Sequence, residues 1–440
     1  MSASSTPPVV VLDDDPTGVQ TLAGIRVLLA WDAQRIGSAL EGRRAVHLIT
    51  NTRALPSERV EGIVADAARA ALDGVPEAAI VLRGDSTLRG HLLEEYRGVR
   101  SVVAPDTWPV LLLVPALPSA GRVTVGGVHL FERDGMRTPL HETEYAHDGL
   151  FAYTSSRLLE WAEERSGGLF RADDGRELGL DALREGGAVA VVDALQDLSA
   201  TGRPCALVPD AETVGDLEAI AEGSRAAVAS GADVVVRCAP TFAGVLAGTT
   251  ATGLVPLPAA PGGLLVVCGS YVEQSRRQLE RLLEHHPGSL AEADVVALAS
   301  DDPSTEITKL AREVSELLFH DAFVVLATPR ERPAETTSLA AGERIAANLA
   351  RVVAALEVPP EVIVAKGGIT SAVTLHEGVG ADEAEVVGPV VPGVSRWSAA
   401  WRDGSPVDYL VVPGNVGEED LLQGLVEGIV RGSARADAVS

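Results

Sequence analysis

Short apolar runs, each breaking into a polar or glycine-rich loop, recur along the whole chain. They stand at 8–12, 45–50, 78–82, 110–114, 264–268, 323–326, 362–365 and 409–412, with shorter examples at 188–192, 234–237 and 295–298. Runs of four to six apolar residues fit strands that are buried on both faces, as in parallel sheets, and stretches with helical periodicity separate them. The sequence therefore predicts an α/β fold with mainly parallel sheets.

The chain of 440 residues is too long for one ordinary hydrophobic core. A segment rich in Gly, Thr and Pro, from Gly248 to Gly263, interrupts the alternation of strands and helices, and a new strand follows it. We predict two α/β domains, residues 1–250 and 251–440.

The composition excludes some binding partners and some kinds of site. The net charge of −26 would repel both nucleic acid and an acidic membrane surface. Lys309 and Lys366 are the two lysines, so arginine supplies nearly all the cations, and its planar fork suits carboxylate and phosphate. The three cysteines are far apart in the sequence, which fits neither a disulfide framework nor a zinc site. With no apolar run of membrane-spanning length, we expect a cytoplasmic protein.

The stretch 83–91, Arg-Gly-Asp-Ser-Thr-Leu-Arg-Gly-His, follows one of the apolar runs. It concentrates two arginines, a carboxylate and two hydroxyls where open α/β sheets hold their ligands, beyond the carboxyl end of a strand. It predicts a clamp for a small polyol acid. The alternative is a solvated loop in which Ser86 or Thr87 caps a helix.

Two other strands of the first half end in polar loops. One continues into Asp13-Asp14-Asp15, and another into Asn51-Thr52-Arg53. Three adjacent carboxylates repel one another, so burying them requires a cation, a hydroxylated ligand or the amides of a helix amino terminus. Asp14 or Asp15 could accept hydrogen bonds from substrate hydroxyls or take a proton from one; the alternative is a turn with an Asp cap.

Glycine-containing loops follow three strands of the second half, at Gly269-Ser270, at 366–371 and at 413–417. Glycines let backbone amides approach phosphate oxygens, and a helix amino terminus adds favourable dipole charge. The loops lack the Walker pattern, so each could also be a simple turn. The segment 138–148 contains His141, Glu144 and His147, which could suggest a metal site, but their spacing matches no strong ligand pattern and a loop that covers the substrate is favoured.

These motifs resemble those of the four-carbon acid sugar kinase family. Its members carry Asp-Asp-x-Thr-Gly, Asp-Ser-Thr-Leu-Arg-Gly, Gly-Gly-x-Thr and Gly-Asn-x-Gly in this order. Here the four motifs stand at 14–18, 85–90, 367–370 and 414–417. The resemblance covers nearly the whole chain, and the six-residue motif is the most specific.

The resemblance implies an ATP-dependent, magnesium-using kinase that phosphorylates the terminal hydroxyl of a small sugar acid of the tetronate or 3-oxo-tetronate class. The acid would bind the first domain and the nucleotide the second, with the reaction in a cleft between them. By matching position, the acid site would comprise Asp14, Arg53, Asp85, Ser86, Thr87, Leu88 and Arg89. The ATP site would comprise Ser270, Gly367, Gly368, Thr370, Gly414, Asn415, Val416 and Gly417. Asp15 and Asp85 are the candidate catalytic bases, no side chain is predicted as a metal ligand, and association into a homo-oligomer is left open.

Some positions depart from the family pattern. Pro16 replaces an aliphatic residue, His91 an asparagine, and Ile369 an acidic residue that could contact magnesium or ribose. These departures concern the identity of the acid and the geometry of the nucleotide site.

Two other functions remain open at this point. Residues 13–17 also satisfy the Asp-x-Asp-x-Thr nucleophile loop of haloacid-dehalogenase-type phosphatases, with Asp13 as nucleophile and Asp15 as acid/base, although Lys366 and the acidic pair 301–302 occur in the reverse of the usual order. A sugar-acid sensor without turnover is the other alternative, and the departure at Ile369 favours it.

Overall fold

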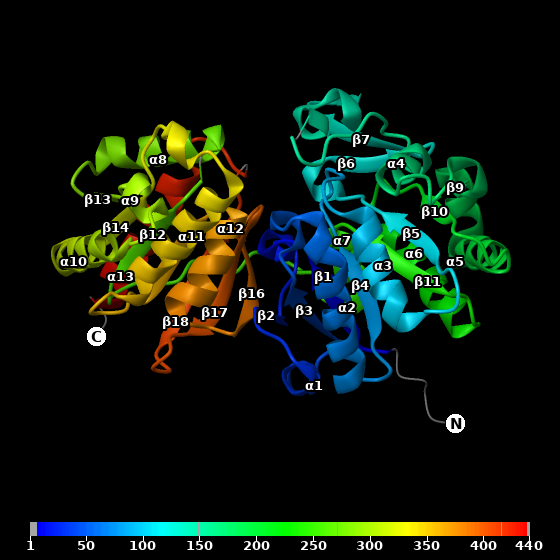
Figure 1. Cartoon of the computed structure of the whole chain (residues 1–440), viewed down its shortest axis with the longest axis horizontal. Coiled ribbons are helices and arrows are strands. Elements are labelled where there is room, and N and C mark those ends of the chain that lie inside the picture. Colours follow the sequence, from blue (N-terminus) through cyan, green and yellow to red (C-terminus); the bar gives the residue numbers. More distant parts are fainter. Residues whose placement is uncertain (1–6, 148, 271, 415, 438–440) are drawn as a thin grey trace. The chain divides into compact units, whose positions relative to one another are not determined.

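The computed structural model describes residues 7–147, 149–270, 272–414 and 416–437. The chain separates into two compact units. Unit 1 comprises the chain up to Gly18 together with Ala30–Thr250, and unit 2 comprises Val19–Leu29 together with the chain from Ala251 onward. Each unit combines helices with mainly parallel strands, which confirms the predicted fold class (Figure 1).

The strands of unit 1 are parallel and run in the order β3-β1-β4-β11-β5-β10-β9. Their bounds are β1 Val9–Asp13, β3 Ala45–Ile49, β4 Ala79–Arg83, β5 Val110–Val114, β9 Arg176–Leu178, β10 Ala206–Pro209 and β11 Val234–Cys238. Because β1 lies between β3 and β4, Asp13 is in register with both Ile49 and Arg83. The loops that follow these three strands therefore meet at the carboxyl edge of the sheet.

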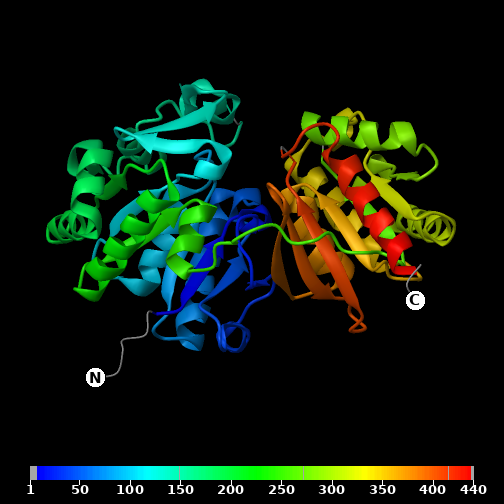
Figure 2. The ribbon, with the colours of Figure 1, turned by 180° about the vertical axis from the view of Figure 1, so that it is seen from behind.

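Helices cover both faces of this sheet. One face carries α1 Ala33–Leu40, α2 Ser57–Gly74 and α3 Leu92–Val103, and the other carries α5 Leu180–Ser199, α6 Val214–Ala229 and α7 Pro240–Ala247 (Figures 1 and 2). On the second face Leu112 of β5 packs in one buried cluster with Leu195, Ile220 and Phe242. The strands are apolar throughout because both of their faces are covered.

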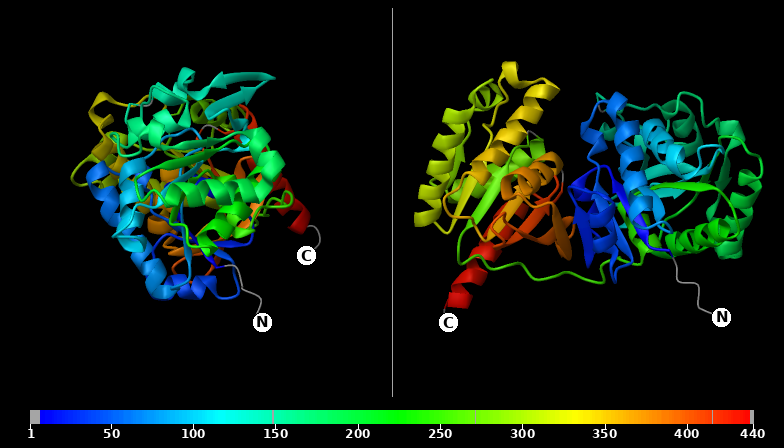
Figure 3. Two further views of the ribbon diagram at one scale, coloured as in Figure 1. Left: turned by 90° about the vertical axis from the view of Figure 1, so that its right-hand side faces the viewer. Right: turned by 60° about the horizontal axis from the view of Figure 1, so that its bottom comes forward.

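A small antiparallel sheet stands beyond the carboxyl edge, reached through the loop that leaves β5 (Figures 1 and 3). Its strands are β6 Arg122–Val125, β7 Val128–Arg133 and β8 Met136–Pro139, paired in sequence order. Two short helical turns, η4 Leu140–Glu142 and η5 Glu144–His147, follow. We call residues 122–153 the cover, leaving aside Asp148, which lies outside the described residues.

Unit 2 has its strands in the order β13-β14-β12-β15-β18-β17-β16-β2, of which the first five are parallel and the rest antiparallel. Their bounds are β2 Ile25–Leu28, β12 Leu264–Cys268, β13 Leu290–Glu292, β14 Phe323–Ala327, β15 Val362–Lys366, β16 Glu383–Val391, β17 Val394–Ala400 and β18 Pro406–Val412. The helices are α8 Glu273–His285, α9 Val295–Ala299, α10 Ser304–His320, α11 Leu339–Ala354, α12 Gly368–Val373 and α13 Leu421–Asp437.

No helix within the described ranges of either unit is long and apolar enough to cross a bilayer.

An early segment of the chain belongs to unit 2. Strand β2 pairs antiparallel with β16, and Nη1 of Arg26 on β2 lies 3.2 Å from Oε1 of Glu383 on β16. The sequence carries no strong signal for β2, because its four residues include a charged one. Between Gly248, which ends α7, and Leu264, which begins β12, the structure contains no helix or strand.

Two of the predicted strands are wrong. Residues 188–192 lie inside helix α5, where Val191 is buried while Val189 is 65% exposed, as helical packing requires. Residues 295–298 lie in helix α9, whose first turn is capped by Asp294: its carboxylate accepts the N–H groups of Val296 and Ala297, both at 3.0 Å. Short apolar runs do not by themselves distinguish a strand from a helix.

Candidate active site

Asp13, the last residue of β1, is fully buried and committed to ion pairs. Its carboxylate contacts the guanidinium of Arg83 at the end of β4 and lies 3.0 Å from Nδ1 of His47 on β3. A buried carboxylate with such partners stays in place and supports its neighbours. Asp13 therefore has the environment of a supporting residue, which disfavours the role of phosphatase nucleophile.

Arg53 and Arg83 hold the next two carboxylates. Arg53 donates from Nη2 and Nε to the two oxygens of Asp14, at 2.7 and 3.1 Å, and from Nη1 to Asp15 at 3.1 Å. Arg83 donates to Asp14 at 3.0 Å and to the carbonyl of Asp15. Asp14 is buried, whereas Asp15 keeps 18% of its side chain exposed. The repulsion among the three aspartates is thus met largely by protein cations.

The loop after β4 brings Asp85, Thr87 and Arg89 together. Arg89 Nε lies 2.6 Å from Asp85 Oδ2, and the Thr87 hydroxyl donates to the same carboxylate. Burial alone would raise the pKa of Asp85, but the charges of Arg53 and Arg89 and these hydrogen bonds hold it well below its usual range. Asp85 is therefore an anion at neutral pH, and its side chain is 12% exposed.

Leu88 is the member of the predicted acid site whose side chain is fully buried, and its backbone has a φ of 68°. Such a conformation is costly for a residue with a Cβ and is maintained by surrounding structure. The turn at Leu88 aims the neighbouring Thr87 and Arg89 side chains at Asp85, so Leu88 shapes the loop through its backbone.

A buried ion pair supports this loop from below. Arg237 at the end of β11 donates to Glu95 of α3 at 3.2 Å and to the carbonyl of Arg89 at 3.4 Å. Gly84 and Gly90 pack directly against its guanidinium, where an added Cβ would come within 2.9 Å. Arg237 therefore supports the acid-site loop, with its guanidinium packed against Gly84 and Gly90 of that loop.

The cover is attached to the same loop. His129 Nε2 on β7 lies 2.9 Å from the carbonyl of Ser86, and the Tyr153 hydroxyl donates to the carbonyl of Thr87 at 3.0 Å. Burial lowers the pKa of His129 to about 4. A neutral ring at Nε2 can donate to the carbonyl while Nδ1 accepts from Thr124 at 3.1 Å.

In unit 2 the predicted nucleotide loops converge at the carboxyl ends of β12, β15 and β18. A Cβ at Gly367 would lie 3.4 Å from the Cβ of Ser270 and 3.5 Å from Oγ1 of Thr370, and one at Gly414 would lie 3.5 Å from Oγ of Ser270. Gly367 has a φ of 107° and Gly368 begins α12. The structure thus brings Ser270, Gly367, Thr370 and Gly414 together.

The last of these loops is anchored to helix α8. Gln278 Nε2 donates to the carbonyls of Val416 and Glu418, at 2.9 and 2.8 Å, and Gln274 donates to that of Gly417 at 2.7 Å. Asn415 lies outside the described residues. These contacts leave the backbone N–H groups of the loop, rather than its carbonyls, for a ligand.

Lys366 is buried below the nucleotide loops. Its Nζ donates to the carbonyl of Pro413 at 2.7 Å, and burial lowers its pKa to about 8. Lys366 therefore ties the end of β15 to the end of β18 and does not point at a phosphate.

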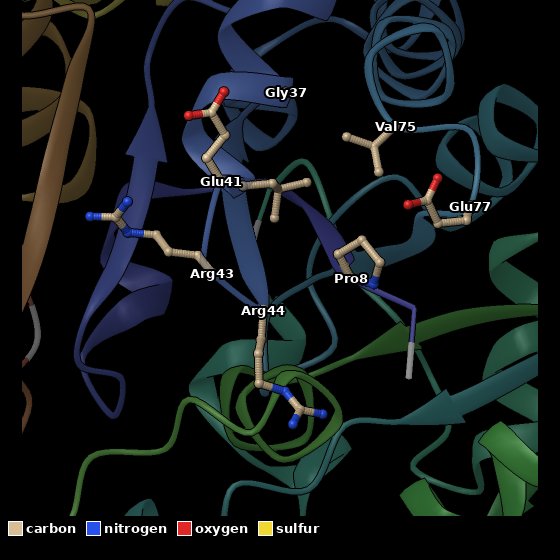
Figure 4. A pocket seen from close by; sticks show the side chains of 8 residues that line it. Pro8, Gly37, Glu41, Arg43, Arg44, Val75 and Glu77 are labelled. Atoms are coloured by element: carbon tan, nitrogen blue, oxygen red, sulfur yellow. The ribbon is translucent and has the colours of Figure 1, made fainter. Parts of the chain in front are cut away.

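Two other hollows lie away from these loops, at residues that belong to neither predicted site. One of about 450 Å³ in unit 1 is lined by Pro8, which precedes β1, and by Arg43 and Arg44, which precede β3, so it opens at the amino ends of these strands (Figure 4). Glu41 and Glu77 also line it. Among the described residues no cluster of three or more His, Cys, Asp or Glu side chains is placed to hold a metal ion.

Several residues of the site escaped prediction from the sequence. They are His47, Glu95, Arg122, His129, Tyr153 and Arg237. Arg237 lies near the end of an apolar strand, which is a usable signal, whereas Glu95 and Tyr153 sit in sequence contexts that give none. Arg83 belongs to the stretch 83–91 predicted to clamp the acid, and in the structure it pairs with Asp13 and Asp14.

The comparisons with known proteins agree with this geometry. Residues 9–246 match the model of a sugar-binding N-terminal domain, and residues 265–422 match that of a nucleotide-binding C-terminal domain. The chain belongs to the four-carbon acid sugar kinase family. The resemblance predicted from the motifs is thereby confirmed.

Two curated relatives of the family are kinases. The chain is 30% identical to the D-erythronate kinase of Heliobacterium modesticaldum over 326 residues, which cover 71% of this chain and 68% of the relative. It is 28% identical to the D-threonate kinase of Salmonella typhimurium over 331 residues, covering 73% and 71%. These relatives favour neither the phosphatase nor the sensor.

Solved structures share the fold. A Haemophilus influenzae protein superposes with a TM-score of 0.66 at 18% identity, covering 96% of this chain and all of that protein. A protein of Salmonella typhimurium LT2 gives a TM-score of 0.71 at 19% identity, covering 97% and 99%. At these identities the likeness concerns the fold alone.

Proposed function

We propose that the protein is an ATP-dependent kinase that phosphorylates the terminal hydroxyl of a small sugar acid of the tetronate or 3-oxo-tetronate class. The observation that carries the proposal is the cluster of Asp14, Asp15, Arg53, Asp85 and Arg89 at one sheet edge of the sugar-binding domain, in a chain that also has a nucleotide-binding domain. A polyol acid needs both acceptors for its hydroxyls and cations for its carboxylate.

Asp15 and Asp85 have different roles toward the attacking hydroxyl of the substrate. Both keep part of their side chains exposed, 18% and 12% respectively. The lowered pKa of Asp85 makes it a weak base but a permanent acceptor, suited to orienting a hydroxyl. We assign proton removal to Asp15, the more exposed of the two carboxylates, because a kinase aspartate accepts the proton of the attacking hydroxyl.

The nucleotide binds at the glycine loops of unit 2. Ser270, Gly367, Gly368, Thr370 and Gly414 to Gly417 would surround the phosphates, with N–H groups of α12's first turn free to donate. Mg²⁺ in kinases is usually held by phosphate oxygens, waters and one or two carboxylates rather than by a protein cage. When bound, it neutralises charge on the transferring phosphoryl group.

The test is ADP release from ATP and Mg²⁺ with a panel of three- to six-carbon sugar acids, D-erythronate and D-threonate first. ADP formed with one acid, and a product phosphorylated at its terminal carbon by phosphorus–proton NMR, supports the proposal. Phosphate release from sugar phosphates without ATP would instead identify a phosphatase.

Asp85→Asn is the sharpest variant for this site. Losing the anion removes the acceptor for the hydroxyl and the carboxylate that holds Arg89, so kcat should fall by about 10²-fold or more while KM for ATP is unchanged. Asp66→Asn on α2, whose side chain is 77% exposed, is the matched control and should keep full activity. Full activity of Asp85→Asn would refute the assignment.

A further inference from the structure

The arginines of the acid-site edge are already paired. Arg53 and Arg83 hold the aspartates of the β1 loop, Arg89 holds Asp85, and Arg237 holds Glu95. A guanidinium engaged with a protein carboxylate has less of its charge and fewer of its donors to offer a substrate. An incoming carboxylate therefore needs at least one cation that is not neutralised in this way, beside any paired arginine that it also contacts.

Arg122 of the cover is such a cation. It begins β6, is half-buried, and forms no ion pair with any described residue. Its Nη1 donates to the carbonyl of Ala120 at 2.9 Å, and its Nη2 reaches the Tyr145 hydroxyl at 3.4 Å. Its Nε has no hydrogen-bond partner in the described part of the chain. Three of its five N–H donors are thus unused.

Aromatic rings fix the place of this guanidinium. Its Cζ lies 5.0 Å from the ring centroid of Phe131 and 5.7 Å from that of Tyr145. The Cζ of Arg89 lies 5.9 Å from the same Tyr145 ring. Rings hold a guanidinium by cation–π attraction without neutralising its charge. Two arginines are therefore gathered around one tyrosine.

The cover carrying Arg122 is fixed to the acid-site loop. Thr124, two residues after Arg122, contacts His129, and His129 contacts the carbonyl of Ser86. Tyr153 at the far end of the cover binds the carbonyl of Thr87. Arg122 is thereby presented at the carboxyl edge, on the cover side of the loop that holds Asp85.

We propose that Arg122, seated against Phe131 and Tyr145, binds the carboxylate of the sugar acid together with Arg89, and so determines selectivity for acids over neutral polyols. This inference rests on the proposed function. An anion between two arginines offsets their mutual repulsion, and a planar fork with free donors matches a carboxylate. The aspartates then accept hydrogen bonds from the hydroxyl end of the substrate.

The experiment compares the acid with its own amide, a neutral isostere, in wild type and in Arg122→Gln. Binding is measured by calorimetry without ATP, and kcat and KM are measured with ATP and Mg²⁺. Wild type should prefer the acid over the amide, and Arg122→Gln should lose about 10- to 100-fold of that preference, the usual range for one hydrogen bond to a charged group. Amide affinity and KM for ATP should be unchanged.

Arg133→Gln is the matched control, because that arginine lies in β7 of the cover and is 76% exposed. It should leave the preference intact. Arg122→Lys should recover part of it, and Tyr145→Phe, which keeps the ring, should lose less than Arg122→Gln.

An unchanged preference in Arg122→Gln overturns the inference, as does an equal loss of affinity for acid and amide. Failure of the proposed function would appear differently: wild type would bind an acid in the calorimeter yet release no ADP with any member of the panel.

Discussion

Replacing Arg237 by Met would leave a buried anion without its partner. The side chains of Arg237 and Glu95 are 2% and 3% exposed, and the guanidinium of Arg237 also packs against Gly84 and Gly90 of the acid-site loop. Removing one member of a buried ion pair costs about 3–5 kcal/mol, because the remaining charge is stranded away from water. At about 2–4 °C per kcal/mol for a unit of this size, the transition of unit 1 should fall by about 6–20 °C.

The pH dependence gives this prediction a second readout. Burial raises the pKa of Glu95 even beside Arg237, so the folded protein binds more protons there than the unfolded chain. Without Arg237 the pKa rises further, and stability is then lost as pH increases through the folded pKa. The deficit of the Arg237→Met variant should therefore be smaller at pH 5 than at pH 8.

Differential scanning calorimetry of the full chain checks both points, with ATP present to identify the transition of unit 2. Arg237→Met combined with Glu95→Gln removes both charges and should recover at least half of the lost stability. A melting temperature within 2 °C of wild type for Arg237→Met, or a double variant no more stable than the single one, would refute the reasoning.

Three further outcomes are expected. Gly84→Ala puts a Cβ 2.8 Å from a buried guanidinium and should destabilise unit 1 by about 1–3 kcal/mol in urea, whereas Gly62→Ala, in open space on α2, should be neutral or stabilising. His129, with a folded pKa below its unfolded value, should make stability fall as pH drops from about 6.5 towards 4, and His129→Gln should flatten this slope in acid titrations. Gly367→Ala strains a φ of 107° and should raise KM for ATP about tenfold without changing KM for the acid. Gly424→Ala on α13, where an added Cβ meets open space, should change neither KM. Equal effects of the two substitutions would contradict the assignment of the nucleotide site.

The sequence predicted the strands whose apolar runs are flanked by clear loops. All six strands that carry the acid and nucleotide motifs, β1, β3, β4, β12, β15 and β18, were found where the runs stand. The local signal suffices there because a strand buried on both faces must be apolar throughout. It failed for 188–192 and 295–298, where a few apolar residues fit a helix stripe equally well.

The motifs in the sequence also indicated the family and the loop at 85–90, because hydroxyls, carboxylates and arginines concentrated after a strand have few other uses. What they could not indicate is which cation meets which anion. Asp13 faces Arg83 because β1 pairs with β4 in that register, and Glu95 meets Arg237 across 142 residues of chain.

The tertiary structure alone decided the division of labour among the arginines. The sequence placed Arg53, Arg83 and Arg89 in loops predicted to hold the acid and gave no signal for Arg122. Folding pairs the first three with aspartates and places Arg122 against aromatic rings without a carboxylate among the described residues. The physical reason is that ion pairing depends on distances of 3–4 Å, which strand register, loop backbone and the docking of the cover set, and which no local pattern of residues encodes.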